Sequence, residues 1–471
     1  MNTYQHEIAA LARSHGLNYR RSTVIWLMMG IFPIIMSGTA INVAIPSLKV
    51  FFGAGHLEVQ ALASSFLASA TAAMLLSGGI IGRFGIRKIY RWVTWGFLIS
   101  SVLAALLPAN GLALLLLLRV IQGFMAGVAQ SLAMIVMMSI FPPEQRGRAI
   151  AFYGLGIALS PTIGPFIGGI CISLLGWQGM FVFSLPFSIW SLFVASRLLP
   201  VSAPFDLPRW IRRTPALYLF GFVTGLSGMF LLWINAPLMA ACFGLAGLAS
   251  LGLFLLDQTQ TSAQMLDFTL LRRPGVLAAC VISFTYGAGL YGSTYLIPVF
   301  LQDLGGRSAW EAGTVLLPGG IVLAFALYLG GVLTDRFQIR WILFSGLLAF
   351  AVANGAFLSV LVSINLSLVV AFTIVGRIGL GLTIPSLNAG ATRMAPESSA
   401  STVMVMVNYF RQLGGTIGVG VVGLLLEFSG PALAAADRIG PYHNAFVAMT
   451  VSFIPALIAV YWMRPTARVP P

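Results

Sequence analysis

The sequence predicts an all-α integral membrane protein with fourteen membrane-spanning helices. Of its 471 residues, 58% are hydrophobic and only 8% are charged, whereas soluble domains carry roughly 25% charged residues. Apolar stretches recur along the whole chain, each close to the ~20 residues that a helix needs to cross a bilayer. Unbroken apolar runs at 111–118 and 366–375 lack the alternation of a membrane β-barrel strand. Because hydrocarbon offers no partner for a free backbone amide, we expect each stretch to be a helix.

The expected spans follow one another closely and leave no segment long enough for a soluble domain. Their ends are set to within a few residues. In chain order they are residues 23–46, 61–81, 90–108, 111–134, 149–174, 180–194, 215–234, 237–256, 275–301, 313–333, 341–362, 366–388, 402–426 and 445–463.

Repeated motifs divide twelve of these fourteen helices into two related groups of six. The same spacing of like side chains occurs twice, as Arg119, Gly123, Gly127 and Gln130 and as Arg377, Gly381, Pro385 and Asn388. We expect a tail at 1–22, a six-helix bundle at 23–200, a linker with two inserted helices at 201–274, a second six-helix bundle at 275–463 and a tail at 464–471. Such duplication is common in secondary transporters, with the binding site between the repeats.

Positive charge is concentrated on one side of the expected membrane. With the N-terminus in the cytoplasm, the inside segments hold twenty Lys and Arg residues between Arg13 and Arg468, and the outside segments hold only Lys49, Arg307 and Arg438. Cytoplasmic loops carry such an excess. The net charge of +14 therefore indicates orientation and not nucleic-acid binding. We expect a multi-pass protein of the cell (inner) membrane, embedded in the lipid bilayer, with both termini cytoplasmic.

Three arginines, Arg119, Arg377 and Arg411, fall inside apolar spans. A charge in hydrocarbon is costly, so such a residue normally faces a bundle interior or a wet cavity. The alternative is a side chain that reaches the headgroups from near a helix end. We expect these arginines to face the bundle interior or a wet cavity. We also expect them, together with Gln122, to take part in transport or in its coupling to protons.

Polar residues in the same helices are candidates for lining a substrate cavity near the middle of the membrane. Asn408 and Arg411, with Gln412 beside them, share one helix face. For two of the candidates, Tyr291 and Tyr295, packing or lipid contact is the alternative. The cavity candidates are Asn42, Tyr291, Tyr295, Asn388 and Asn408.

The fifth span carries the sequence GLGIALSPTIGPFIGG from Gly154 to Gly169. Small residues at every fourth position let another helix approach closely, and Pro161 and Pro165 permit bending. We expect Gly164 and Gly168 to lie on a seam that moves during the working cycle. A static packing seam is the alternative.

Other chemistry is not expected. The three cysteines lie singly in apolar spans, without disulfide or metal spacing, and no GxxxxGK[ST] nucleotide loop occurs. A membrane-embedded enzyme would need a nucleophile or metal site, usually with a histidine or carboxylate at depth. We therefore expect no enzyme activity, cofactor or metal. A sensor or scaffold would leave the buried arginines without a role.

These motifs resemble those of the major facilitator superfamily, and within it the fourteen-span drug:proton antiporters of the EmrB/QacA type. The resemblance covers essentially the whole chain. It implies the major facilitator fold, here two six-helix bundles plus two inserted helices, with the helix 4 arginine in proton coupling and the helix 5 motif in export. The matches are Gly78, Arg83 and Gly85 in the cytoplasmic loop motif, Arg119, Gln122 and Gly123 in helix 4, Gly164, Pro165, Gly168 and Gly169 in the helix 5 antiporter motif, Asn42, Val43, Ala44 and Pro46 in helix 1, and Trp177, Phe181, Phe183 and Pro186 at the entry to helix 6.

The chain departs from the family pattern at two aspartate positions. Gly82 replaces the aspartate of the loop motif, although the second copy keeps Asp335, and Ser37 replaces an aspartate common in helix 1. None of the twelve acids lies near the middle of a span. Proton coupling therefore runs through an acid at a helix end such as Asp335, runs through the ionisation of the substrate, or does not occur.

We expect a secondary active transporter that exports small amphiphilic molecules in exchange for protons by alternating access. Its partners are the small-molecule substrate and protons, and a periplasmic adaptor protein is left open. Because the deep charges are all positive, we expect amphiphilic weak acids or neutral compounds as substrates. The alternatives are a broad multidrug pump that uses an acid at a helix end, an exporter of one specific organic acid or metabolite, and a membrane protein without transport activity.

Overall fold

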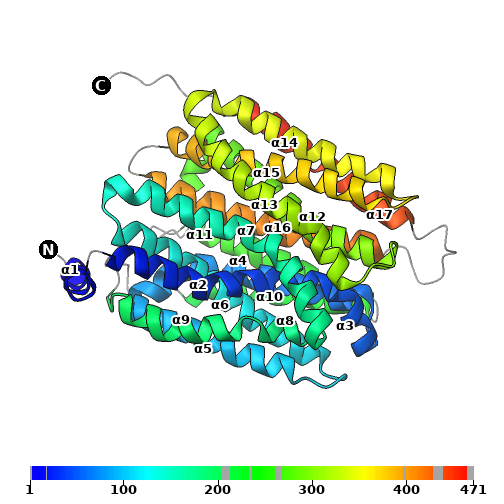
Figure 1. Ribbon diagram of the computed structural model, residues 1–471, viewed down its shortest axis with the longest axis horizontal. Coiled ribbons are helices and arrows are strands. Elements are labelled where there is room, and N and C mark those ends of the chain that lie inside the picture. Colours follow the sequence, from blue (N-terminus) through cyan, green and yellow to red (C-terminus); the bar gives the residue numbers. More distant parts are fainter. Residues whose placement is uncertain are drawn as a thin grey trace.

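The computed structural model describes residues 3–16, 18–202, 213–232, 236–260, 268–395, 399–427 and 439–463, whose regular structure is entirely helical. The long helices lie side by side along the longest axis of the molecule (Figure 1). The elements are α1 (Thr3–His15), α2 (Tyr19–Ala40), η1 (Ile41–Val43), α3 (Ile45–Phe52), α4 (His56–Phe84), α5 (Ile86–Ala105), α6 (Leu112–Ile140), α7 (Pro143–Leu175), α8 (Gly179–Val182), α9 (Leu185–Leu198), α10 (Arg213–Leu232), α11 (Pro237–Gln260), η2 (Phe268–Arg272), α12 (Pro274–Asp303), α13 (Ala309–Arg336), α14 (Ile339–Ala356), η3 (Phe357–Val360), α15 (Leu366–Met394), α16 (Ala400–Glu427), α17 (Ile439–Val451), α18 (Ile454–Ala459) and η6 (Val460–Trp462).

Twelve helical segments of the described chain are long and apolar enough to cross a membrane. A helix lies at each of the fourteen expected positions, but α5 and α10 are not among the twelve. The first turns of α5 hold Arg87, Lys88 and Arg91, and the described apolar stretch of α10 is Leu217–Leu226. The all-helical architecture with membrane-length helices is confirmed, and the count of fourteen spans stays a prediction.

The chain forms an N-terminal half, α2 to α9, and a C-terminal half, α12 to η6. In Figure 1 the helices α2, α5 and α9 lie below the yellow helices α14 and α15. Two helix pairs join the halves, because α7 packs against α13 and α4 packs against α16. The expected inserted helices α10 and α11 pack on each other, and α10 also packs on α4. The domain boundaries read from the sequence stay predictions.

The repeated Arg-Gly spacing produces similar packing in both halves. A Cβ atom added at Gly123 would collide with the carbonyl oxygen of Phe66, and one at Gly127 with that of Ala70. Since both pairs advance by four residues, α6 lies along α4 with its glycines in register with the α4 backbone. In the second half, a Cβ added at Gly381 of α15 would collide with α13.

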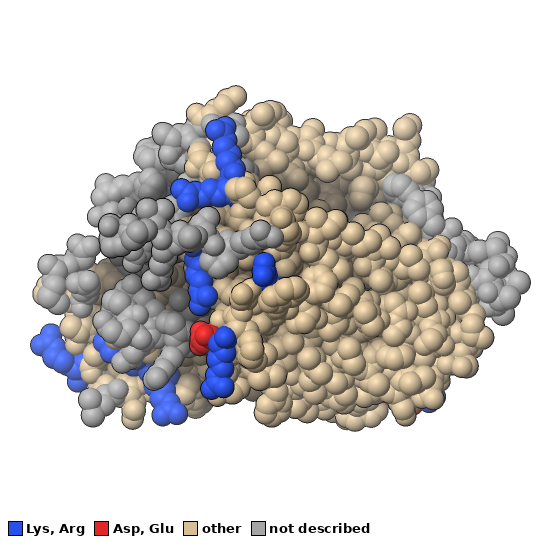
Figure 2. All heavy atoms as spheres, turned by 90° about the horizontal axis from the view of Figure 1, so that it is seen from above, with Lys and Arg blue, Asp and Glu red and all other residues tan. Residues whose placement is uncertain are grey.

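The two ends of the bundle differ in charge. The basic end holds α1 and the junctions α4–α5 and α13–α14, and Figure 2 shows most of the visible Lys and Arg side chains in the half of the face toward one end. Its basic residues include Arg83, Arg87, Lys88, Arg91, Arg336 and Arg340. The opposite end holds α3, α8 and the α12–α13 junction. Its described charged residues include Lys49, Arg307, Glu58, Asp303, Glu311 and Glu427.

Candidate functional site

Arg119 is completely buried and joins three helices. Its Nε–H donates to the Leu62 carbonyl of α4 at 3.2 Å, and its Nη1 donates to Ser37 Oγ of α2 at 3.2 Å and to Gln122 Oε1 at 3.0 Å. Its Nη2 donates to the Ser37 carbonyl at 3.3 Å, and the guanidinium carbon lies 4.3 Å from the centre of the Phe66 ring. Each of these partners is neutral, so dipoles and a π-system stabilise the charge.

The end of α2 explains why Ser37 can accept twice from Arg119. The α-helix ends at Ala40, and the Ile41 N–H bonds to the Thr39 carbonyl. In a longer helix that N–H would bond to the Ser37 carbonyl. The Ser37 carbonyl is therefore left for the guanidinium, at the position where the family pattern commonly has an aspartate.

Arg377 of α15 is 2% exposed, and its Nη2 donates to Thr294 Oγ1 of α12 at 3.0 Å. Asn42 of the N-terminal half donates to the Thr294 carbonyl at 3.2 Å. Thr294 therefore links two predicted residues, and the sequence reasoning missed it. Nη1 of Arg377 has no hydrogen-bond partner among the described residues. Arg377 borders a cavity of about 10 Å³, close to the space that one water molecule needs.

Arg411 of α16 lies between the two halves in a different environment. Its side chain is half-buried and lies within electrostatic range of the hydroxyls of Tyr153, Tyr286 and Tyr291. The Tyr291 hydroxyl donates to Gln412 Oε1 at 3.2 Å. Hydroxyl groups from both halves thus lie within electrostatic range of Arg411.

Five hydrogen bonds join described residues of the two halves, and together they form what we call the seal. On α4 they run from His56, at the end opposite to the basic end, to Thr71 near the middle of the helix. The bonds are Asn42 Nδ2 to the Thr294 carbonyl (3.2 Å), Leu57 N to Glu427 Oε2 (3.3 Å), Gln60 Nε2 to the Val419 carbonyl (2.5 Å), Thr71 Oγ1 with Thr416 Oγ1 (3.2 Å) and Tyr295 Oη with His56 Nε2 (2.9 Å). The halves are therefore joined by hydrogen bonds at the end opposite to the basic end.

Three predicted residues lie outside these contacts. Asn388 and Asn408 are half-buried, and Asp335 is exposed at the end of α13. The described acids near the opposite end accept hydrogen bonds at helix termini, as Glu58 does from the Gly55 N–H and Glu311 from the Ser308 N–H. Among the described spans, none has an acid near its middle, in agreement with the sequence analysis.

The cytoplasmic-loop motif forms a tight turn at the basic end. Gly85 ends α4 with φ = 80°, and a Cβ there would collide with the Val201 carbonyl oxygen, so both backbone and space require glycine. The Arg83 guanidinium lies 5.3 Å from the centre of the Phe84 ring. Gly78 faces open space.

Helix α1 stabilises this turn through hydrogen bonds, and the sequence analysis did not predict that role for α1. Glu7 accepts hydrogen bonds from the backbone N–H groups of Val201 (2.8 Å) and Ser202 (3.1 Å) and from Ser202 Oγ (2.6 Å). Burial raises the pKa of the Glu7 carboxyl, but these hydrogen bonds outweigh it and hold that pKa below its ordinary value. Tyr4 also bonds to Ser139 Oγ at the end of α6, at 2.5 Å.

The small-residue face of α7, which is the fifth expected span, contacts α2 in the same half. A Cβ at Gly164 would meet Thr39 Oγ1, and one at Gly168 would meet the Ala40 carbonyl oxygen. This face therefore packs within one half, and its movement during the working cycle stays a prediction. The contact between the halves is made nearby, where Gly169 meets α13 and where Gly313 of α13 meets the Pro165 carbonyl.

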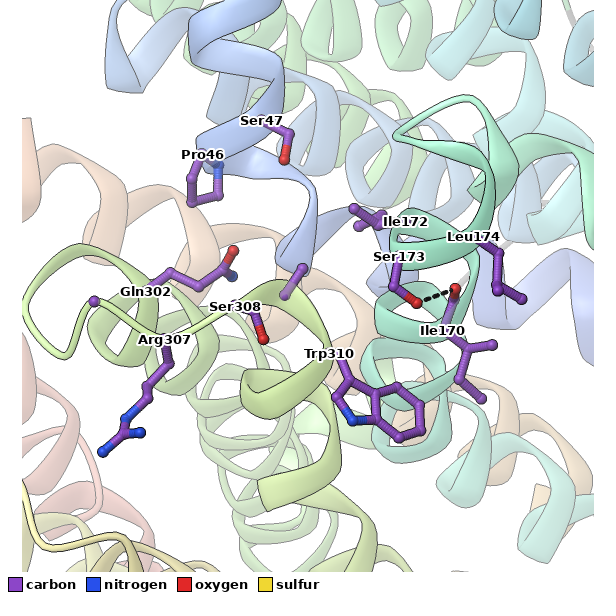
Figure 3. A pocket seen from close by; sticks show the side chains of 12 residues that line it. Pro46, Ser47, Ile170, Ile172, Ser173, Leu174, Gln302, Arg307, Ser308 and Trp310 are labelled. Atoms are coloured by element: carbon purple, nitrogen blue, oxygen red, sulfur yellow. Dashed lines mark hydrogen bonds between the residues drawn. The ribbon is translucent and has the colours of Figure 1, made fainter.

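A cavity of about 770 Å³ opens at the opposite end and is lined by both halves. In Figure 3, Pro46 and Gln302 line it from separate elements, and Trp310 lies toward Ile170. Its lining comes from Pro46, Ser47, Ile170, Ile172, Ser173, Leu174, Gln302, Gly306, Arg307, Ser308, Ala309 and Trp310. None of the five predicted cavity residues is among them, and Asn42, Tyr291 and Tyr295 instead form hydrogen bonds inside the bundle.

Two related helical halves, joined by two helix pairs and holding buried arginines between membrane-length helices, define the class of two-fold repeated membrane transporters. The family model described as Major Facilitator Superfamily matches residues 27–419 and 324–471. The chain belongs to the Major Facilitator Superfamily and is a multi-pass membrane transporter.

Several curated relatives carry names from drug resistance. The chain is 25% identical over 439 residues to the multidrug transporter protein MdtP of Bacillus subtilis, an alignment that covers 91% of this chain and 79% of that one. It is 24% identical over 394 residues to the methylenomycin A resistance protein of Streptomyces coelicolor, covering 83% and 82% of the two chains. The putative multidrug resistance protein MdtD of Salmonella heidelberg is 25% identical over 447 residues, covering 93% and 94%.

Solved structures show the same fold at low sequence identity. A bacterial homologue of the human lysosomal transporter Spinster, in an inward-facing and unoccupied conformation, is 17% identical with a TM-score of 0.65, over 95% of this chain and 97% of that one. The xylose transporter XylE of E. coli, in a partially occluded inward-open conformation, is 15% identical with a TM-score of 0.64, over 94% and 98%.

Proposed function

We propose that the protein exports small amphiphilic molecules, in exchange for protons, by alternating access of its two halves. The drug-resistance names of its relatives support export. We place it in the fourteen-span EmrB/QacA-type group, in the inner membrane with both termini cytoplasmic. The basic end then faces the cytoplasm, and the seal lies at the outer end.

The position of the seal supports alternating access. Its five hydrogen bonds join the halves from the outer end to the level of Thr71. A transporter of this design must close one side while the other side admits substrate. The outer cavity beside the seal, which both halves line, is then the route by which substrate leaves after the halves separate.

The single observation that carries the substrate class is the chemistry around the deep arginines. Arg119 has neutral partners, and Arg377 keeps one guanidinium nitrogen without a partner among the described residues. A buried positive charge attracts anions and repels cations at low effective dielectric. We infer that the substrates are amphiphilic weak acids or neutral compounds. A specific organic acid is the second candidate, favoured by the same charges.

We assign the roles of the site residues accordingly. Arg377 and Arg411 face the substrate path with Asn388 and Asn408, and Arg119 with Gln122 couples α2, α4 and α6 to it. Asp335 is exposed, which argues against a helix-end acid as the group that couples export to protons. We therefore assign this coupling to the ionisation of the substrate itself.

Transport by the purified protein in proteoliposomes tests this function. A fluorescent amphiphilic carboxylic acid should be transported when a pH gradient is imposed, and the transport should stop when an ionophore collapses the gradient. Vesicles with Arg119→Ala protein provide the matched inactive control. The proposal fails if wild-type vesicles move neither acids nor neutral amphiphiles faster than protein-free vesicles.

A further inference from the structure

The outer seal contains an ionisable ring that the transport scheme does not use. His56 is the first residue of α4, and its side chain is only 8% exposed. Its Nε2 lies 2.9 Å from the hydroxyl oxygen of Tyr295 in α12, which is fully buried. The two rings meet edge to face with their centres 6.2 Å apart. This contact crosses directly from the N-terminal to the C-terminal half.

The charged groups around this contact are one cation and three carboxylates. Lys49 of α3 is the cation that acts on His56. The nearby carboxylates accept from other donors: Glu58 from the Gly55 N–H, Glu427 of α16 from the Leu57 N–H and Asp303 of α12 from the Tyr442 hydroxyl. A proton on the ring would place a second positive charge beside Lys49 in a site with little water.

Protonation therefore has opposite consequences in the two arrangements of the halves. In the sealed arrangement a charged imidazole loses hydration and is repelled by Lys49, so charging is costly. Once the halves separate at the outer end, the ring meets water and titrates near the ordinary histidine value of about 6.5. The open arrangement thus binds the proton more readily, and proton binding must favour opening by the same free energy.

We propose that His56 is a proton-binding site that controls the outer seal, which forms on the neutral imidazole and opens when the imidazole is charged. The inference rests on the proposed alternating access. The site regulates and does not carry the transported proton. The seal re-forms only after the proton has left, and from an open outer end it leaves to the same side from which it came.

The distance between the outer ends of the halves tests this directly, without any substrate. Spin labels attached to cysteines at Val50 of α3 and Val362 before α15 report that distance, because both side chains are 85% exposed and lie on different halves. The native cysteines Cys171, Cys242 and Cys280 are first replaced by serine. Electron–electron double resonance between about pH 7.5 and about pH 5.5 spans the histidine range and leaves ordinary carboxyls ionised.

The long-distance population should grow as the pH falls, with the ratio of open to sealed molecules rising up to about tenfold per pH unit below about 6.5. His56→Gln keeps a polar partner for Tyr295 but cannot be charged, so its ratio should not change with pH. His443→Gln, the same substitution at an exposed histidine of α17, should respond like wild type. Tyr295→Phe should raise the open ratio already at about pH 7.5, since it removes the hydrogen bond.

The inference is overturned if His56→Gln responds to pH as wild type does, or if wild type does not respond. If His56→Gln protein does not fold, an unchanged open ratio in Tyr295→Phe protein overturns it equally. These distances are measured without substrate. A failure of the proteoliposome transport test, with the pH response intact, would therefore count against export and leave the proton site standing.

Discussion

Arg119 illustrates at the residue scale how this chain holds a deep charge without an acid. Its guanidinium donates to Ser37, Leu62 and Gln122, which lie on three helices. A planar fork of donors suits such a set, whereas a single ammonium group does not. The charge therefore contributes to the packing of the N-terminal half as well as to the field in the proposed substrate path.

Substituting Arg119→Ala should abolish transport while the protein still inserts into the membrane. The acceptors on Ser37 and Gln122 lose their partner, and each such loss costs about 1–3 kcal/mol, so the thermal midpoint should fall. Arg119→Lys should not restore transport. Transport assays and thermal unfolding in detergent measure both effects, with Arg91→Ala at an exposed position of α5 as the control. Normal export by the alanine variant would refute this role.

Substituting Ser37→Asp should stabilise the protein. A carboxylate beside the Arg119 guanidinium replaces a neutral acceptor by a charged one, and hydrogen bonds to charged groups contribute about 1.5–3 kcal/mol, against about 1 kcal/mol for neutral ones. Ser37→Asn, of similar size but neutral, should not give this gain. Thermal unfolding compares the two. Equal midpoints for the Asp and Asn variants would mean that the buried charge does not need an acid.

At the scale of helices, the positions of the elements and the arginine faces could be read from the sequence, because spacing by four residues defines one face of a helix. Spacing does not tell which neighbour that face meets. The Gly164 face lies on α2 and not between the halves. Thr294 and His56 are single polar residues without a periodic pattern, and their contacts with the other half arise only when helices from different halves meet.

Leucine substitutions at paired glycines should separate packing within a half from packing between halves. Gly164→Leu should wedge α7 from α2 and lower the yield of folded protein, whereas Gly154→Leu in the same helix faces open space and should be tolerated. Gly313→Leu should wedge α13 from α7 and favour the open outer end, with Gly331→Leu of α13 as the unhindered control. Size-exclusion profiles and the spin-label distance measure these effects. Folded, sealed Gly313→Leu protein would contradict the assignment.

At the scale of the whole molecule, the proposed orientation and the proposed alternating access rest on the distribution of charge and of hydrogen bonds. The basic end and the sealed end lie at opposite ends of one helical bundle. The sequence analysis could predict the first from the loops, because it depends on composition alone. It could not predict the second, because the seal depends on which side chains of the two halves meet.

Reporter fusions should place the basic end in the cytoplasm. Fusions after Arg91 and after Arg213 should report the cytoplasm, and a fusion after Arg438 should report the exterior, since the expected loops alternate across the membrane. Alkaline phosphatase and a fluorescent protein give complementary signals at each site. A cytoplasmic signal after Arg438 would contradict the count of fourteen spans.

The charge of the preferred substrate tests the central claim most directly, because the claim rests on deep arginines with neutral surroundings. Competition is measured in proteoliposomes that transport the fluorescent amphiphilic acid, with hydrophobic organic acids and quaternary ammonium compounds of matched size and hydrophobicity as competitors. The account predicts that the organic acids inhibit transport and that the quaternary ammonium compounds do not, since a buried positive field repels cations. Strong inhibition by a permanently charged cation, or its transport as the best substrate, would contradict the account.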